Sequence, residues 1–527
     1  MPLPHPSHFD HTKLRLVRGK QHCIGVGTLF FHENYLVGCA RKLHCDGRYR
    51  TVFGPAFHHD GVIYCVCPEC LNIAFQRVSS VRAPDEPGKH QILYDNQQIF
   101  FSENHSVYQL IADRLSVAFF QFESAHQQVL AHVDDVHPKR ELRRAAHADL
   151  TESGGYGLQQ WVTRRHKVMK EFMKPQEWAK PGKCGRIVFD LGVEASLQGS
   201  YILEMTKSAI CGIDYPYKGG HIRVVKKVTN TELVHCFTHL MQPAGTYYYC
   251  LYSDDACASY YKDGKPVFLN IDISKCDQSH GTSIFQKLLE IFPLHVRRFI
   301  KPLIDQCSFQ IKVKNPLRPK EKVVYELKRP ILPSGSTLTT MLNNIASLAI
   351  AICLVDSKFE RDASERAGYM VTFEQSDRYV DLMFLKHVPF FDTCNILRAF
   401  PAVGIMLRAS GCCKGDLQGR GDFYQRARDF QSRLLHGIYP RTSFSLLDRL
   451  LDIAGGRPSS YQPLKSTFAS DYEGEYYTID DIEWCSRYRI NPAELQGLIE
   501  LLQPTHNQTL TIQTAASRKI LAMDYGL

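Results

Sequence analysis

The stretch "YYYCLYSDDACASYYKDGKPVFLNIDISKCD", which runs from Tyr247 to Asp277, decides the fold. It contains three runs rich in aromatic and aliphatic residues, which are typical of β-strands. Two polar tips separate the runs, Ser253-Asp254-Asp255 and Asp263-Gly264. Asp-Gly is a strong hairpin signal because a type I′ turn requires a positive φ. The stretch therefore predicts three consecutive antiparallel strands.

The antiparallel arrangement also predicts where the acidic residues meet. The Asp-Gly turn joins the second run, "ACASYY", to the third, "PVFLNIDI", so the end of the third lies beside the start of the second. Asp272 is thereby brought next to Asp254 and Asp255. Carboxylates held together repel one another unless a cation binds them, and Mg²⁺ prefers a few carboxylates together with phosphate oxygens. The pattern therefore predicts a divalent-metal site suited to a nucleoside triphosphate.

Two other Asp-Asp pairs have simpler explanations. Asp134-Asp135 precedes Pro138 and is typical of a solvated loop. Asp481 lies three residues after Thr478, which resembles a capping box at the start of a helix. Only Asp254-Asp255 stands between two strand-like runs, although a hairpin tip with two acids can also be a simple turn.

A third feature is the segment "PSGSTLTTMLNNIASLAIAICLV", which predicts a Ser334-Gly335 turn followed by a long helix. Thr339 and Asn343 are four residues apart and so share one helix face. Two interpretations remain open: a buried helix with a polar start, or a loop and helix that face the sugar of a nucleotide. The apolar run Ile345–Val355 is shorter than the ~20 residues of a membrane span, so we expect no transmembrane segment.

Composition places the chain among globular proteins. It has 527 residues, 44% hydrophobic residues and a formal net charge of +9, which suits an anionic partner. Its 18 cysteines are scattered, and the N-terminus does not resemble a secretory signal. We therefore expect reduced thiols in a cytosolic compartment.

The first 150 residues are rich in Cys and His. Cys67 and Cys70, in "CVCPEC", have zinc-knuckle spacing. The spacing of the other candidates is irregular, which favours ordinary buried cysteines over a structural Zn²⁺ site. These candidates are Cys39, His44, Cys45 and Cys65.

These segments resemble the palm of viral RNA-dependent RNA polymerases. "DISKCD", with Asp272 and Asp277 five residues apart, looks like motif A, and "SGSTLTTMLN" looks like motif B. "YSDD" looks like motif C with Ser253 in place of the commoner glycine. "FERDASERAGYMVTFE" and "FLKHVPF" look like motifs D and E. Motif C therefore precedes motif A, and the order C, A, B, D, E resembles the permuted polymerases of permutotetraviruses and birnaviruses.

The resemblance implies a fold and a division of the chain. The fold is α+β: a right-hand polymerase with fingers, palm and thumb, a permuted ferredoxin-like antiparallel palm sheet and an N-terminal extension. Residues 1–150 form that extension and the fingertips, and 151–245 form the fingers. Residues 246–393 form the palm. Residues 394–527 form a helical thumb, in which "INPAELQGLIELLQP" predicts a helix that starts after Asn-Pro and ends at Pro504.

The same resemblance assigns roles at the site. Asp254 and Asp272 are implied as catalytic metal ligands for two Mg²⁺ or Mn²⁺ ions, with Asp255 in support. Asp277 and Asn343 are implied to read the ribose 2′-hydroxyl, which distinguishes ribonucleotides from deoxyribonucleotides. The nucleotide-binding set is completed by Ser334, Gly335 and Thr339.

Further upstream, "KPGKCGRIVFDLGVEASLQG" resembles the basic motif F of the fingers. Arginine suits bidentate phosphate contacts and lysine supplies a point charge, although a solvated basic loop is the alternative. The residues implied to meet triphosphate and template are Lys180, Lys183, Arg186 and Lys207. The strand after Gly368 carries no lysine, so the motif D general acid is not identified.

The implied function is template-directed RNA synthesis for a viral genome in the host cytoplasm, within replication complexes. Its partners are RNA, nucleoside triphosphates and other viral replication proteins. Alternatives are an inactive RNA-binding replication subunit, against which the intact aspartates argue, and a metal-dependent phosphohydrolase. The motif B helix and basic fingers argue against the hydrolase. A reverse transcriptase would not usually keep Asn343 together with Asp277.

Overall fold

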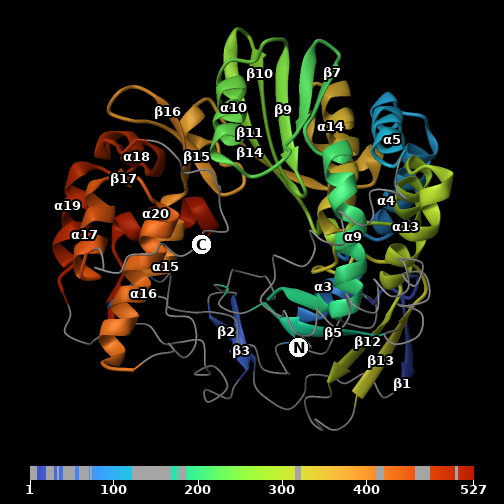
Figure 1. Cartoon of the computed structure of the whole chain (residues 1–527), viewed down its shortest axis with the longest axis horizontal. Helices are drawn as coiled ribbons and strands as arrows, with labels where there is room; N and C mark the ends of the chain where they lie inside the picture. The colour runs from blue at the N-terminus through green and yellow to red at the C-terminus, as the bar shows by residue number, and fades with distance from the viewer. Residues whose placement is uncertain are drawn as a thin grey trace.

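A computed structural model gives the fold of the chain (Figure 1). It describes residues 9–18, 29–32, 35–39, 54–57, 71, 74–120, 168–174, 177, 185–314, 322–410, 420–456, 475–504 and 509–526. Asp134-Asp135 and the candidate zinc ligands other than Cys39 lie outside these ranges. For Cys39, which lies in β3, the structure describes only the backbone.

A six-stranded sheet holds the stretch that opened the sequence analysis. The three predicted antiparallel strands are confirmed as β9, β10 and β11, which are neighbours in the order β14-β11-β10-β9-β8-β7 (Figure 1). The strands span β14 Val371–Ser376, β11 Lys265–Ile273, β10 Asp255–Lys262, β9 Tyr247–Tyr252, β8 Gly220–Val224 and β7 Ile213–Tyr217.

Both hairpin tips have the backbone conformation that their residues suggest. Asp263 and Gly264 have φ values of 52° and 75°, as a type I′ turn requires. At the other tip, Ser253 has a φ of 56°, in the left-handed region that favours glycine. These turns hold β9, β10 and β11 in one continuous meander.

The antiparallel pairing expected for residues 246–393 holds for β9, β10, β11 and β14. The sheet extends beyond these residues, and there it departs from the expectation. β8 pairs with β9 in parallel, so the sheet is mixed. The reason is the connection: α10 (Asn230–Met241) links the two strands, and a crossover helix returns the chain to the same end of the sheet. Leu233 and Phe237 of α10 pack with Tyr248 and Cys257 on one face of the sheet.

The other face of the sheet packs on the largest core, which is built around α14 (Thr339–Asp356). The helix is long and apolar enough to cross a membrane by length and composition, yet every residue from Met341 to Val355 is buried inside the protein. An all-round apolar helix is what a central core position requires. The helices of this region are α4 Lys89–Ser102, α5 Ser106–Ala118, α9 Val193–Ile210, α11 Cys276–Ser279, α12 Thr282–Ile291, α13 Leu294–Gln306 and the 3₁₀ helix η2 Arg361–Ala367.

A second sheet of five strands combines distant segments in the order β1-β13-β12-β5-β6. Its strands are β1 Leu14–Arg18, β13 Lys322–Leu327, β12 Gln310–Lys314, β5 Val168–Met173 and β6 Ile187–Asp190. Smaller elements are the strand pairs β2 Leu29–His32 with β3 Tyr35–Cys39 and β19 Thr509–Ile512 with β4 Gly54–Phe57, and the helix α3 Gln76–Ser79. In this sheet, β6 lies beside the loop that precedes α14.

Helices dominate the C-terminal part, as the periodicity predicts. Asn491 caps α19 in a capping box with Glu494, which confirms the predicted helix start. The capping box proposed at Thr478 and Asp481 is wrong, because Asp480 is the N-cap of α18. The elements are β15 His387–Phe391, β16 Leu397–Pro401, α15 Val403–Ser410, α16 Phe423–Ile438, β17 Thr442–Ser443, α17 Ser445–Ile453, β18 Tyr477–Thr478, α18 Asp481–Tyr488, α19 Pro492–Leu501 and α20 Ala515–Tyr525.

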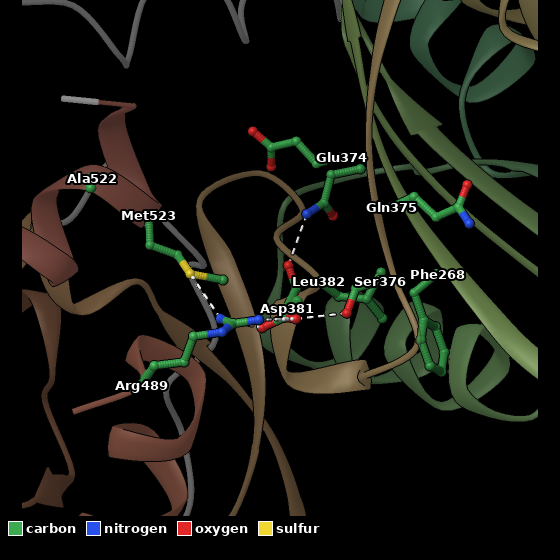
Figure 2. Close-up of a pocket in the computed structure, with 10 residues that line it drawn as sticks. Phe268, Glu374, Gln375, Ser376, Asp381, Leu382, Arg489, Ala522 and Met523 are labelled. Carbon is green, nitrogen blue, oxygen red and sulfur yellow. Dashed lines mark hydrogen bonds and ion pairs between the residues drawn. The ribbon is translucent and has the colours of Figure 1, made fainter. Parts of the chain in front are cut away.

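Polar contacts join these helices to the six-stranded sheet. Figure 2 shows Arg489 reaching Asp381, which lies in the 3₁₀ helix η3 (Tyr379–Asp381), with Nη2 2.9 Å from Oδ2. Ser376 at the end of β14 donates to the same carboxylate at 2.6 Å. Asn270 of β11 donates to the Asp381 carbonyl at 2.8 Å. A cavity of about 310 Å³ lies at this junction.

We predict that Gly264→Ala lowers the free energy of unfolding by about 1 kcal/mol, because alanine is strained at positive φ. No atom lies within 4 Å of the added Cβ, so the cost is conformational. Gly497→Ala is the matched control: it also has open space but sits in helix α19. It should stabilise by about 0.5–1 kcal/mol. Chemical unfolding of both variants checks this, and equal effects would contradict the turn assignment.

Candidate active site

The acidic residues meet where the sequence predicts. Asp255, the first residue of β10, lies directly opposite Asp272 of β11. Residues directly opposite in an antiparallel pair project to the same face of the sheet. Asp254 stands beside them in the turn; it and Asp272 are exposed, whereas Asp255 is half-buried. Three carboxylates therefore share one end of the sheet.

Asp255 is the most buried of the three carboxylates. Burial raises its pKa to about 7, and the charges of Asp254 and Asp272 act in the same direction. One hydrogen bond opposes this effect: the Leu385 N–H donates to Asp255 Oδ2 at 2.7 Å. This crowding of carboxylates fits a divalent cation, which relieves like-charge repulsion in a way that a single N–H cannot.

Asp277 and Asn343 are brought into contact. Asn343 Nδ2 donates to Asp277 Oδ1 at 2.9 Å and to Ser253 Oγ at 3.3 Å. Burial, with a contribution from Asp254, raises the pKa of Asp277 to about 6, although hydrogen bonds from Asn343 and Ser334 lower it. The hydroxyl of Ser253 thus has a partner in Asn343.

Helix α14 holds the hairpin tip through two further side chains. The Ser253 N–H donates to Asn344 Oδ1 at 2.6 Å. Ser347 Oγ donates to the Ser253 carbonyl. Because three α14 side chains contact one residue of the tip, the helix and the acidic turn form a single unit.

The loop before α14 packs on β6. The Phe189 N–H donates to the Ser334 carbonyl at 2.7 Å, and a Cβ on Gly335 would lie 2.6 Å from the Phe189 oxygen. Gly335 is therefore required by close approach as well as by its φ of 106°. Thr339 Oγ1 donates to the Ser336 carbonyl at 2.8 Å, so in this structure its hydroxyl serves the helix start.

The basic residues fall into three cases. Arg186 forms a bidentate ion pair with Glu177, with Nε 2.8 Å from Oε1. Burial alone would lower the pKa of Arg186, but Glu177, and then Asp254 and Asp272, raise it. Lys207 is exposed in the last turn of α9. Lys180 and Lys183 lie outside the described residues.

Two functional features escape sequence reasoning. Glu177 holds Arg186 toward the acidic tip, and nothing in the sequence around Glu177 signals that contact. Lys386, inside the motif E segment, stands near Asp255. Burial, together with the positive charges of Arg408, Lys174 and Arg186, lowers the pKa of Lys386 to about 8. Two positively charged residues, Arg186 and Lys386, therefore stand near the acidic residues.

Cys276, Asp277 and His280 form a further group whose candidate metal-ligating atoms lie within 4.8 Å of one another. Their hydrogen bonds explain the grouping without an ion. Both ring nitrogens of His280 have partners, Asn343 Oδ1 at 2.7 Å and the Tyr369 hydroxyl at 2.8 Å. Burial raises the pKa of the Cys276 thiol, which disfavours the thiolate that binds metals.

No protein-family model matches the sequence, and no curated protein matches it. The structure is similar to the birnavirus VP1-VP3 complex, with TM-score 0.39 and 10% identity, over 57% of this chain and 45% of that one. It is also similar to the RNA polymerase VP1 from Infectious Pancreatic Necrosis Virus, with TM-score 0.37 and 10% identity, over 63% of this chain and 47% of that one. The match spans less than half the length of each of those two chains.

We predict that Asp255→Asn stabilises the protein at pH 8 and has little effect at pH 4. The raised pKa of Asp255 means that the folded state binds its proton more tightly than the unfolded state. Ionisation of Asp255 therefore lowers the free energy of unfolding. This loss is absent below about pH 4 and complete above about pH 7. Thermal unfolding in EDTA measures the difference. Asp480→Asn, an equally good N-cap, should change little at either pH.

Proposed function

We propose that this chain is a template-directed RNA polymerase. One observation carries the proposal: Asp255 pairs with Asp272 beside Asp254, and Asn343 links Asp277 to the same hairpin tip. A set of carboxylates for cations therefore adjoins a polar pair suited to a ribose hydroxyl. A nucleotidyl transferase that selects ribonucleotides needs both.

In this proposal Asp254 and Asp272 would hold two divalent cations, Mg²⁺ or Mn²⁺, with Asp255 as a supporting ligand. Such cations supply activation of the attacking hydroxyl and charge neutralisation on the leaving group. The bond that forms joins the 3′-oxygen of the RNA to the α-phosphorus of the incoming nucleoside triphosphate. The bond that breaks is the one between this phosphorus and the oxygen of the departing pyrophosphate. Leu385, by donating to Asp255, keeps that carboxylate in place.

Positively charged and polar residues around this centre hold the nucleotide. Arg186 is directed toward the acidic tip by Glu177 and offers guanidinium N–H groups to the triphosphate. Asp277 reads the 2′-hydroxyl, and Asn343 holds the Asp277 carboxylate in place for this contact. Ser334 and Gly335 of the adjoining loop and Thr339 at the start of α14 complete the nucleotide site. The proposal extends the triphosphate and template contacts to Lys180, Lys183 and Lys207.

The assay that tests this function also separates the alternatives. The protein is incubated with an RNA template, labelled ribonucleotides and Mg²⁺ or Mn²⁺. Template-dependent labelled RNA supports the polymerase. RNA binding without synthesis would favour an inactive replication subunit, and release of phosphate without a polymer would favour a phosphohydrolase. The proposed partners are RNA, nucleoside triphosphates and viral replication proteins, in the host cytoplasm.

We predict that Asp254→Asn and Asp272→Asn each abolish synthesis. Removing either carboxylate disables the same metal-binding unit, so the double variant should be little worse than either single one. Asp480→Asn is the control and should retain activity, because Asp480 caps a helix away from this hairpin. Single-nucleotide extension of a primed template measures the rates; additive losses would argue against one shared unit.

We predict that Arg186→Lys raises the KM for the triphosphate by about tenfold, because lysine cannot reproduce the bidentate geometry. The fold should tolerate this change, since the lysine side chain would keep a positive charge opposite Glu177. Arg15→Lys is the matched control: Arg15 pairs with Glu326 on the five-stranded sheet. Steady-state kinetics with both variants checks this, and an unchanged KM in Arg186→Lys would make Arg186 a purely structural cation.

A further inference from the structure

Asn343 is buried, with a relative exposure of 1%, and its side-chain amide is fully engaged. Its Nδ2 group donates both hydrogens, to Asp277 and to Ser253. Its Oδ1 accepts from His280 Nε2 at 2.7 Å and from Cys276 Sγ at 3.5 Å. The two ends of the amide therefore face partners of opposite character.

His280 determines which end of the amide faces Asp277. It is buried, with a relative exposure of 1%, and burial lowers its pKa to about 4, so the ring is neutral near pH 7. A neutral imidazole donates from one nitrogen and accepts at the other. The Asn343 NH₂ group is committed to the Asp277 carboxylate, so Nε2 faces the Asn343 oxygen and must carry the proton. The Tyr369 hydroxyl, 2.8 Å from Nδ1, can then donate to that nitrogen. His280 then presents a donor to Asn343.

The opposite orientation of Asn343 would be unfavourable at both ends. A flipped amide would turn its oxygen toward the Asp277 carboxylate and its NH₂ group toward the Nε2–H of His280. Both would be repulsive contacts between buried polar groups, which are costly when they lack partners. Asp277 at one end of the amide, and His280 backed by Tyr369 at the other, therefore hold Asn343 in a single orientation.

We propose that His280 and Tyr369 are positioning residues for sugar selection: they hold the Asn343 amide, and through it Asp277, in the arrangement that recognises a ribose 2′-hydroxyl. The proposal rests on the function proposed above. Neither residue needs to touch the nucleotide. A site arranged to hydrogen-bond a hydroxyl discriminates strongly against the analogue that lacks it, so loosening the arrangement should weaken discrimination before it weakens synthesis.

The test compares ATP with 2′-deoxyATP in two assays. Single-nucleotide extension of a primed RNA template with Mg²⁺ measures the ratio of incorporation efficiencies. Binding to the same template carrying a 3′-deoxy-terminated primer measures the ratio of affinities without turnover. The variants are His280→Leu, which removes the donor, His280→Gln, which keeps an N–H donor, and Tyr369→Phe, which removes only the hydroxyl.

We expect His280→Leu to reduce the preference for ATP by about tenfold in both assays, and Tyr369→Phe to reduce it by about threefold. His280→Gln should restore most of the preference. Tyr108→Phe is the matched control, because the buried Tyr108 hydroxyl donates to the Ile345 carbonyl of the same helix at 2.7 Å. It should lower the melting temperature without changing the ratio.

The outcomes distinguish this proposal from the proposed function. Synthesis by the wild type with an unchanged ratio in Tyr369→Phe and in folded His280→Leu would overturn the positioning role and leave the polymerase intact. A wild type that shows no preference for ATP in binding would also overturn it. A wild type that binds ATP preferentially but makes no RNA would refute the polymerase, while the binding ratios would still decide the role of His280.

Discussion

The structure of the site depends on the register between β10 and β11. The two-residue turn at Asp263-Gly264 pairs Lys262 with Lys265, and every later pair follows, ending with Asp255 opposite Asp272. A slip of one residue would move a whole strand's side chains to the other face of the sheet. The buried residues Ala256, Ala258 and Ile271 on one face would then lose their packing. The apolar core therefore enforces the position of the carboxylates.

The second constraint is the contact between the hairpin tip and α14. Ser253 adopts a left-handed conformation that is costly for a residue other than glycine, and it persists only where its surroundings hold it. Three side chains of α14 supply those surroundings, through the backbone and the hydroxyl of Ser253. Because α14 is buried over nearly its whole length, the tip is anchored to a helix at the centre of the core.

Local patterns explain what could be predicted. The Asp-Gly turn, the alternating strands and the long apolar helix are features of short segments, and they suffice to place Asp254, Asp255 and Asp272 together. The parallel pairing of β8 with β9 could not be predicted as readily, because it depends on how α10 crosses the sheet. Contacts through loops, such as Arg186 with Glu177 nine residues away, or between distant segments, such as Leu385 with Asp255, leave no periodic signal. His280 looks like any core histidine until its two partners are known.

The position of the acidic hairpin ahead of α14 in the chain has a consequence for how the site is built during synthesis of the chain. Asp254 and Asp272 are separated by a single tight turn, whereas Asp277 and Asn343 are 66 residues apart. Contacts between near neighbours in the chain form quickly, on the order of microseconds for a hairpin, and distant ones must wait for loop closure. A chain emerging from the ribosome can therefore pair β10 with β11 before α14 has been made. The pair of strands that carries Asp255 and Asp272 is a local structure, and the contact between Asp277 and Asn343 is added when the core closes.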